Sequence, residues 1–123
     1  MSEATIGLVL DCADPEALAS FWAAALGLER LGNAGAYVLL ASPTRALPKL
    51  LLQRVDEPKR VKNRMHLDIE IPDVDAEVAR LEAVGATRIV EQPRREHGSR
   101  WMVMADPEGN EFCVCDNGQQ NAP

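Results

Sequence analysis

The sequence predicts an α+β fold in which two βαβββ modules form a curved mixed sheet around a cleft. A repeat is the first observation behind this prediction, because residues 7–27 and 66–85 share one order of features. Each begins with a strand-like stretch, reaches an Asp, continues as a helical pattern and closes on Gly. Shorter strand-like stretches after each helix are the second observation. The length of 123 residues suits one domain, 1–123, with modules at about 4–56 and 64–117.

The first module is predicted to start with a strand from Gly7 and to continue as a helix capped by Asp14. Asp at this position can accept hydrogen bonds from free amides of the first turn, and Pro15 suits the first helical position. Gly27 can take the left-handed conformation that closes a helix. The apolar face of the helix carries Leu18, Trp22 and Leu26. We expect strands near 29–31, 36–41 and 49–55. We also expect Trp22 to pack in the core.

The second module repeats this pattern with a strand over 66–71 and a helix capped by Asp73 and closed by Gly85. The predicted buried face carries Val74, Val78, Leu81 and Val84. Strands are expected at 87–91, 100–105 and 111–116, with a turn over 106–109 built on Pro and Gly. The segment Arg94–Arg100 is predicted to be a loop over the cleft mouth. The basic stretch 56–64 is predicted to be a solvated linker rather than a binding patch.

Composition narrows the class of protein. The net charge of −6 argues against a general nucleic-acid binder, which needs a basic surface for phosphates. No apolar stretch approaches membrane-spanning length, so we expect a cytoplasmic protein without a membrane partner. The odd count of three cysteines argues against a disulfide framework. We expect Cys113 and Cys115 to be buried or half-buried strand thiols rather than a thiol metal site, which would need more ligands at supporting spacing.

Strand alternation separates a polar face from an apolar one. In the stretch 66–71, one face carries three apolar residues, and the other carries His66, Asp68 and Glu70. If the polar faces line a cavity, its lining is acidic and rich in hydrogen-bonding groups, with one imidazole. That lining comprises Asp11, Gln53, His66, Asp68, Glu70 and Glu111. The alternative is that these faces simply meet water, and the pattern does not decide between the two.

Three stretches, 14–22, 62–68 and 101–114, resemble a glyoxalase-like domain of the glyoxalase/bleomycin-resistance/dioxygenase (vicinal oxygen chelate) superfamily. The resemblance covers nearly all of the chain up to Asp116. In metal-dependent members the ligands come from the first and last strand of each module. These positions are Gly7, about Leu51, His66 and Glu111. Only His66 and Glu111 can ligate through a side chain, so no tight metal site and no cofactor are expected, although a divalent metal is compatible. The resemblance also implies a homodimer.

These observations leave several functions open. The first is a protein that binds a small organic molecule in its cleft without an assigned activity. The second is a divalent-metal-dependent lyase, isomerase or dioxygenase that uses His66 and Glu111, with Glu70 or Asp68 as candidate base. The third is a drug-sequestering protein without catalysis, similar to bleomycin-resistance proteins, in which Trp101 stacks on a cationic ligand. A metal-independent enzyme using His66 with a carboxylate ranks below these. The candidate ligand-binding residues are Asp11, Gln53, His66, Asp68, Trp101 and Glu111.

Overall fold

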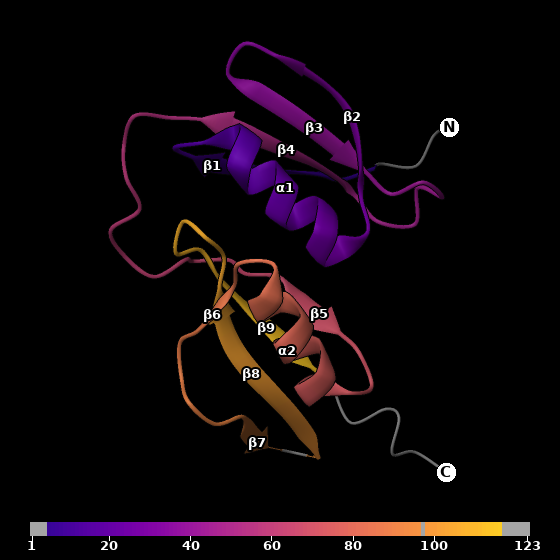
Figure 1. Cartoon of the computed structure of the whole chain (residues 1–123), viewed down its shortest axis with the longest axis vertical. Coiled ribbons are helices and arrows are strands. Elements are labelled where there is room, and N and C mark those ends of the chain that lie inside the picture. Colours follow the sequence, from indigo (N-terminus) through magenta and orange to yellow (C-terminus); the bar gives the residue numbers. More distant parts are fainter. Residues whose placement is uncertain (1–4, 97, 117–123) are drawn as a thin grey trace. The chain divides into compact units, whose positions relative to one another are not determined.

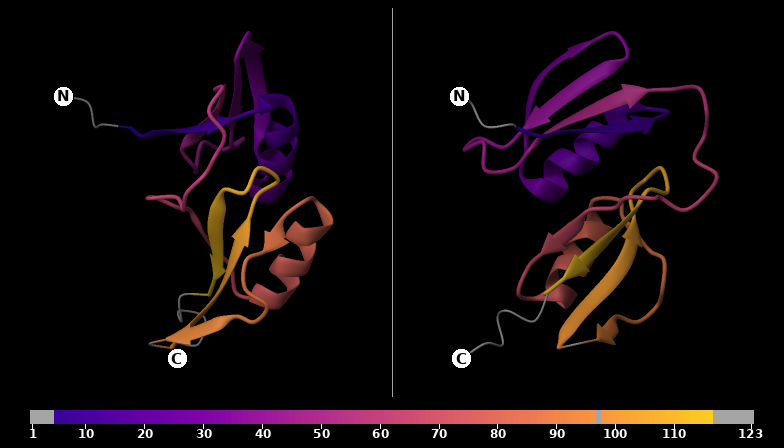
Figure 2. Two further views of the ribbon diagram at one scale, coloured as in Figure 1. Left: turned by 90° about the vertical axis from the view of Figure 1, so that its left-hand side faces the viewer. Right: turned by 180° about the vertical axis from the view of Figure 1, so that it is seen from behind.

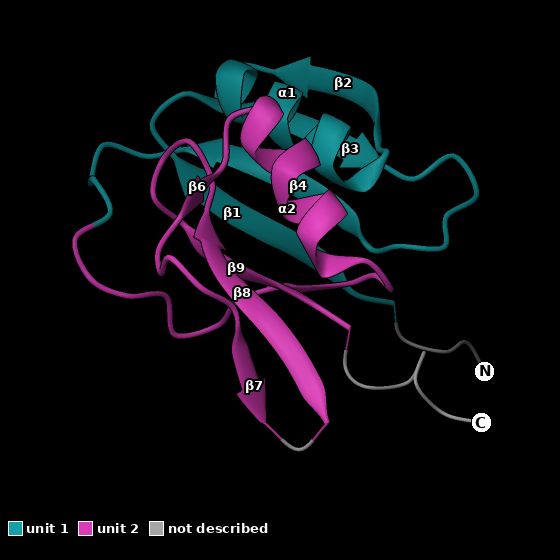
Figure 3. Cartoon of the chain, turned by 60° about the horizontal axis from the view of Figure 1, so that its bottom comes forward, with its two compact units in different colours: residues 1–59 teal, residues 60–123 magenta. Residues whose placement is uncertain are grey.

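The computed structural model describes residues 5–96 and 98–116, and the chain divides into two compact units, Met1–Lys59 and Arg60–Pro123. Figure 3 colours the two units separately. Each unit is a βαβββ-type module with its own mixed sheet (Figure 1). The predicted α+β fold with two such modules is therefore confirmed. Among the described residues, no helix combines the length and the apolar content needed to cross a membrane.

The first unit builds a four-stranded sheet with the order β1-β4-β3-β2. The first and last strands, β1 (Gly7–Cys12) and β4 (Lys49–Arg54), pair in parallel. The strands β2 (Glu29–Ala34) and β3 (Tyr37–Ala41) complete the sheet as antiparallel neighbours. All four strands overlap the stretches expected from the sequence. The helix α1 (Pro15–Leu26) covers one face of this sheet, as Figures 1 and 2 show.

The core of the first unit lies between α1 and the covered face of its sheet. Trp22 is fully buried at 2% exposure, and its ring meets that of Phe21 edge to face with centroids 5.0 Å apart. The predicted core position of Trp22 is thus confirmed. The remaining large side chains of this core are Leu18, Val38, Leu40, Leu50 and Leu52, all almost fully buried. Among the described residues of this unit, no helix lies on the opposite face of the sheet, and Val9 on that face is 58% exposed.

Both predicted ends of α1 are confirmed. The Asp14 side chain accepts a hydrogen bond from the Ala17 backbone N–H at 3.2 Å, and Pro15 occupies the first helical position. Gly27 takes the left-handed conformation, with φ of 66° and ψ of 38°, and its N–H donates to the Ala23 carbonyl. These contacts satisfy backbone groups that an uncapped helix leaves without partners.

Replacing Asp14 with alanine should lower the free energy of unfolding by about 0.5–2 kcal/mol, because the helix loses the acceptor for a first-turn amide. Urea denaturation followed by circular dichroism measures this loss. Asp14→Ser is the matched control, since its hydroxyl can still accept the bond, and it should stay close to the parent chain. Equal losses in both variants would show that another property of Asp14 matters more than the cap.

The second unit builds its sheet from five strands in the order β5-β9-β8-β6, with β7 also paired to β8. Its first and last strands again pair in parallel, and the others are antiparallel. The helix is α2 (Val74–Ala83). The strands are β5 (Asp68–Glu70), β6 (Thr87–Arg88), β7 (Arg94–Glu96), β8 (Ser99–Ala105) and β9 (Glu111–Cys115).

Some sequence-based expectations for this unit are wrong. Gly85 is not the residue that caps α2, because the helix ends at Ala83 and Val84 takes the C-cap position. The segment Arg94–Arg100 is not a loop, because Arg94–Glu96 forms β7 and pairs in register with Ser99–Trp101. This hairpin is held by backbone hydrogen bonds, which an exposed polar sequence does not reveal. His97 in that segment lies outside the described residues. Val84 is not on the buried face of α2, because the helix ends at Ala83 and Val84 is 38% exposed.

The predicted turn between β8 and β9 is confirmed and is tightly hydrogen-bonded. Asp106 is 2% exposed, and its carboxylate accepts bonds from the Glu108 and Asn110 backbone N–H groups and from the Asn110 side chain. Gly109 has a φ of +85° and donates to the Asp106 carbonyl. A turn fixed in this way sets the register of β9 against β8, and hence decides which β9 side chains face the site described next.

Candidate functional site

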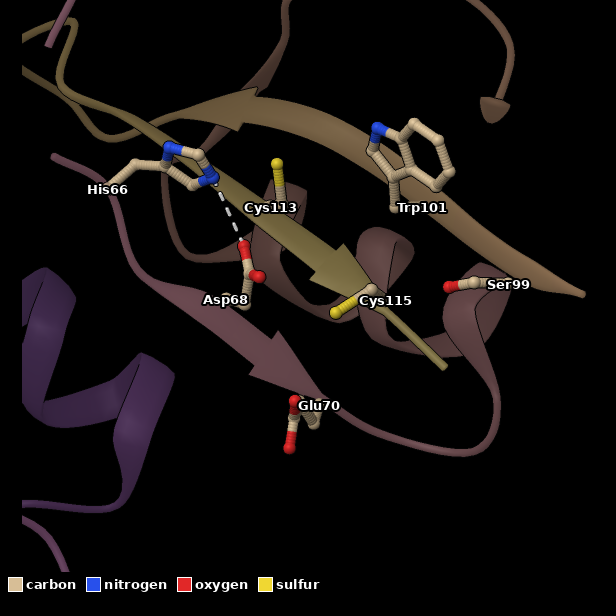
Figure 4. A pocket seen from close by; sticks show the side chains of 7 residues that line it. All are labelled: His66, Asp68, Glu70, Ser99, Trp101, Cys113 and Cys115. Atoms are coloured by element: carbon tan, nitrogen blue, oxygen red, sulfur yellow. Dashed lines mark ion pairs between the residues drawn. The ribbon is translucent and has the colours of Figure 1, made fainter. Parts of the chain in front are cut away.

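The open face of the second sheet gathers the polar side chains that strand alternation assigned to one side. Asp68 and Glu70 on β5 lie opposite Cys113 and Cys115 on the parallel strand β9. On the other side of β9, Trp101 of β8 lies opposite Cys115. In Figure 4 the two thiols therefore lie between the carboxylates and the indole.

A pocket of about 260 Å³ opens on this face (Figure 4). Every residue of its lining belongs to the second unit and comes from β5, β8, β9 or the segment just before β5. The lining consists of His66, Asp68, Glu70, Ser99, Trp101, Cys113 and Cys115. The structure thus brings together four residues singled out from the sequence, namely His66, Asp68, Glu70 and Trp101.

His66 and Asp68 form a polar contact within the pocket, with Nε2 of His66 3.2 Å from Oδ1 of Asp68. The side chains are 39% and 53% exposed. A neutral imidazole can donate one hydrogen bond in this geometry, and a protonated one makes an ion pair. An exposed pair of this kind contributes little to stability, so its value lies in orienting the imidazole toward the pocket.

The floor of the pocket is made of two protonated thiols. Burial raises the pKa of Cys113, and the Asp68 carboxylate raises it further, while Lys62 and Arg94 act in the opposite direction. Burial also raises the pKa of Cys115, to about 11, with additional contributions from Asp68 and Glu70. Both residues are buried, at 9% and 7% exposure, which confirms the expected strand thiols. At neutral pH the floor is therefore uncharged and weakly polar.

Three chemically different donor atoms meet at one end of the pocket. One ligand atom each of His66, Asp68 and Cys113 lies within 4.8 Å of the other two. Strand pairing places the second and third of these directly opposite each other.

Glu111, the second metal-ligand candidate, lies at the start of β9 and is not part of the pocket lining. Its Oε1 accepts a hydrogen bond from the Asn63 backbone N–H at 3.0 Å, and its carbonyl accepts one from the Asn63 side chain at 3.0 Å. These two hydrogen bonds join the end of the basic linker, at Asn63, to the start of β9. It gives the Glu111 carboxylate a structural role within the second unit.

The metal set implied by the family resemblance does not fit the residues of the first unit. Val9 pairs with Leu51 in β1–β4, and Asp68 pairs with Cys113 in β5–β9. Val9 and Asp68 are equivalent, because each lies two residues after the start of its copy of the repeat. Their strand partners, Leu51 and Cys113, are therefore equivalent as well. The residue that corresponds to Glu111 is therefore Lys49, a cation, and not Leu51 as expected from the sequence. Gly7 offers no side chain either, so neither of the two family positions in this unit carries a ligating side chain.

Asp11 and Gln53, the remaining candidates, are neighbours in the first unit. They pair directly across β1 and β4, on the face that α1 does not cover. Asp11 is exposed and Gln53 is half-buried. Their part in binding stays a prediction.

Sequence reasoning missed three pocket residues, Ser99, Cys113 and Cys115. The alternation in β9 did place both cysteines on the same face as Glu111, and this was the available signal. Ser99 lay inside the segment interpreted as a loop, so no strand face was assigned to it.

The paired βαβββ modules define the vicinal oxygen chelate class of proteins. The chain belongs to the glyoxalase-like domain family, whose sequence profile matches residues 7–115, as the resemblance predicted. A search of the curated proteins found no match.

Solved structures with the same fold are distant in sequence. A glyoxalase/bleomycin resistance protein/dioxygenase family enzyme from Burkholderia phytofirmans has a TM-score of 0.72 at 18% identity, covering 88% of this chain and 94% of its own. A glyoxalase/bleomycin resistance protein from Albidiferax ferrireducens has a TM-score of 0.66 at 21% identity, with coverages of 89% and 94%. A mutant of the fosfomycin resistance protein FosX from Listeria monocytogenes, complexed with Mn(II) and dihydroxypropylphosphonic acid, has a TM-score of 0.75 at 18% identity, with coverages of 95% and 92%. Likeness at this level shows the fold alone.

Proposed function

We propose that the pocket of the second unit binds a small cationic organic molecule. The observation that carries this proposal is that two carboxylates, Asp68 and Glu70, line one pocket with the Trp101 indole. Carboxylates attract a cation through charge, and the face of an indole attracts it through the ring quadrupole. Both carboxylates are exposed, so a ligand can reach them.

The size and floor of the pocket restrict the ligand further. A pocket of about 260 Å³ is smaller than most sites for drug-sized molecules, so it suits a ligand of few heavy atoms. The buried thiols of Cys113 and Cys115 offer an uncharged floor for methyl or methylene groups. A substituted ammonium with an apolar surface matches this combination. Binding of this kind needs no catalysis.

A metal-dependent lyase, isomerase or dioxygenase using His66 and Glu111 is a weaker candidate. The Glu111 carboxylate is hydrogen-bonded to the Asn63 backbone, and the equivalent residues of the first unit, Gly7 and Lys49, cannot ligate. Asp68 and Glu70 stay candidate bases for any chemistry in the pocket, because both carboxylates line it. The homodimer and the contributions of Asp11 and Gln53 stay predictions.

Choline should bind to the metal-free chain and shift the indole N–H resonance of Trp101 in nuclear magnetic resonance spectra. Its uncharged isostere dimethylbutanol should bind at least about fivefold more weakly, because one charge–charge contact near a protein surface contributes 1 kcal/mol or more. Glu70→Gln should weaken choline binding by about the same factor for the same reason. Trp22 is buried in the first unit, so its indole signal should stay in place as an internal control.

Glu57→Gln provides the matched control variant, since it removes the same charge from an exposed residue that does not line the pocket. Choline affinity should remain unchanged in it. Equal affinities for choline and dimethylbutanol, or equal weakening in Glu57→Gln and Glu70→Gln, would contradict charge recognition in this pocket. A Trp101 signal that never moves across the series would contradict the pocket itself.

A further inference from the structure

We propose that His66, Asp68 and Cys113 form a binding site for one Zn²⁺ ion at one end of the pocket. An imidazole nitrogen, a carboxylate oxygen and a thiol sulfur lie within 4.8 Å of one another there. These are the three ligand types that zinc takes in proteins.

The distances already approach those of a tetrahedral ion. Typical zinc–ligand lengths place two ligand atoms of one tetrahedral ion about 3.3–3.6 Å apart. Nε2 of His66 and Oδ1 of Asp68 are 3.2 Å apart, so this pair needs almost no adjustment. Since no donor pair is more than 4.8 Å apart, the Cys113 sulfur has to close by about 1.5 Å at most.

The strands supply the rigidity that such a site needs. Asp68 and Cys113 are direct partners in the parallel pair β5–β9, so backbone hydrogen bonds hold their Cα atoms in place. His66 lies two residues before Asp68 and outside the strand, with its side chain 39% exposed. Rotation of side chains about these fixed Cα atoms, that of Cys113 above all, allows the trio to contract around an ion without moving the sheet.

The chemistry of the trio favours zinc over the harder cations. Mg²⁺ and Ca²⁺ prefer an all-oxygen ligand set, whereas a thiol with an imidazole suits Zn²⁺ and similar borderline ions. The buried Cys113 thiol has to lose its proton on binding, and a coordinated dication favours the thiolate strongly enough to release it. The carboxylates of Asp68 and Glu70 further stabilise a cation in the pocket. Three protein ligands leave a fourth position open.

This site differs from the metal set that the family resemblance implies. Only His66 is shared between the two sets. Asp68 on β5 is an additional ligand, and Cys113 takes the place of Glu111, two residues further along β9. The second unit therefore contributes all three ligands, and Glu111 stays hydrogen-bonded to Asn63.

Zinc binding should also weaken the binding of the organic cation to the pocket. This consequence, unlike the site itself, depends on the proposed function. Both occupants are positive and both require Asp68, so one Zn²⁺ should lower the affinity of the pocket for choline.

Cobalt(II) is the probe for the test, because a cobalt–thiolate bond gives a charge-transfer absorption that reports the ligand directly. The untagged chain, freed of metal with a chelator, should bind one Co²⁺ with this band, and Zn²⁺ should displace it. Asp68→Asn should weaken Zn²⁺ binding by more than about tenfold, since even the loss of an outer-shell partner costs 10–100-fold. Asp68 is exposed, so this variant should fold as the parent chain does. Cys113→Ser should abolish the band.

Two matched variants decide between this site and the alternatives. Cys115→Ser removes the neighbouring thiol and should keep the band, and Glu111→Gln should leave Zn²⁺ affinity unchanged. Urea midpoints of all variants show whether each is folded. The proposal is overturned if the folded chain gives no charge-transfer band with one equivalent of Co²⁺, if the band survives Cys113→Ser, or if Glu111→Gln removes binding while Asp68→Asn does not.

The two proposals fail independently. The zinc titration contains no organic ligand, and the choline titration contains a chelator. Metal binding without any choline response would leave the zinc site standing and remove the proposed function, and the converse result would do the reverse.

Discussion

Replacing Trp22 with alanine should lower the free energy of unfolding by about 3–5 kcal/mol, the usual cost of deleting a fully buried aromatic side chain. Trp22 is 2% exposed and packs edge to face on Phe21 beneath the first sheet. Its removal takes away apolar contact area and leaves a cavity that the rigid strands around Leu40 and Leu52 cannot close. Urea denaturation measured at equilibrium gives this loss directly.

Trp101→Ala is the matched control, because it deletes the same side chain from a half-buried position at the pocket. Its effect on unfolding should be clearly smaller than that of Trp22→Ala, while its effect on choline binding should be larger. Similar losses of stability in both variants would mean that Trp101 is part of a core, and would argue against its role as a ligand contact.

The helices could be predicted because their signals are local in the sequence. Helix periodicity is local, and Leu18 and Trp22 carry it four residues apart between the cap at Asp14 and the glycine at Gly27. All of these features stand within one short window of the sequence. The prediction that Val84 lies on the buried face of the helix was wrong, because the pattern does not reveal that the last turn ends one residue earlier.

Strands were harder to predict where a segment becomes a strand only by pairing with another segment of the chain. The segment Arg94–Glu96 has no apolar alternation, and only its hydrogen bonds to β8 make it a strand. Likewise, the register that matches Lys49 to Glu111 follows from the parallel pairs β1–β4 and β5–β9. Each pair joins segments more than 40 residues apart, so a local pattern cannot fix it.

Part of the candidate site could be predicted because alternation is also local. His66, Asp68 and Glu70 alternate over five residues, and they do line one pocket. That Cys113 lies opposite Asp68 depends on strand pairing, and an isolated thiol in an apolar strand is normally a core residue. The trio of donor atoms is therefore visible only in three dimensions.

Cys115 should react with an aromatic disulfide such as dithiobis(nitrobenzoic acid) along a pH profile whose midpoint lies near 11. Burial raises its pKa to that value from an ordinary thiol value of 9.0, and the carboxylates of Asp68 and Glu70 add to the rise. The thiolate is the reacting form, so the rate should increase about tenfold per pH unit from pH 8 until the pKa is reached. An unperturbed thiol would have its midpoint near pH 9.

At pH 8 the reaction should be at least about tenfold slower in the folded chain than in the same chain unfolded in urea. A rise of the pKa from 9.0 to about 11 leaves the folded thiol with about 100-fold less thiolate. The greater intrinsic nucleophilicity of that thiolate recovers a factor of about ten at most, so a net loss of about tenfold remains. The low exposure of 7% slows the reagent further. Mass spectrometry of peptides assigns the modified residue among Cys12, Cys113 and Cys115.

Glu70→Gln tests the electrostatic part of this pKa shift. Removing a negative charge beside Cys115 favours its thiolate, so the midpoint should move to lower pH and the rate at pH 8 should rise. Glu57→Gln removes the same charge from the linker region and should leave the profile in place. A midpoint near 9 in the folded parent chain would mean that the thiols are open to water. The pocket would then lack the uncharged floor on which the proposed ligand rests.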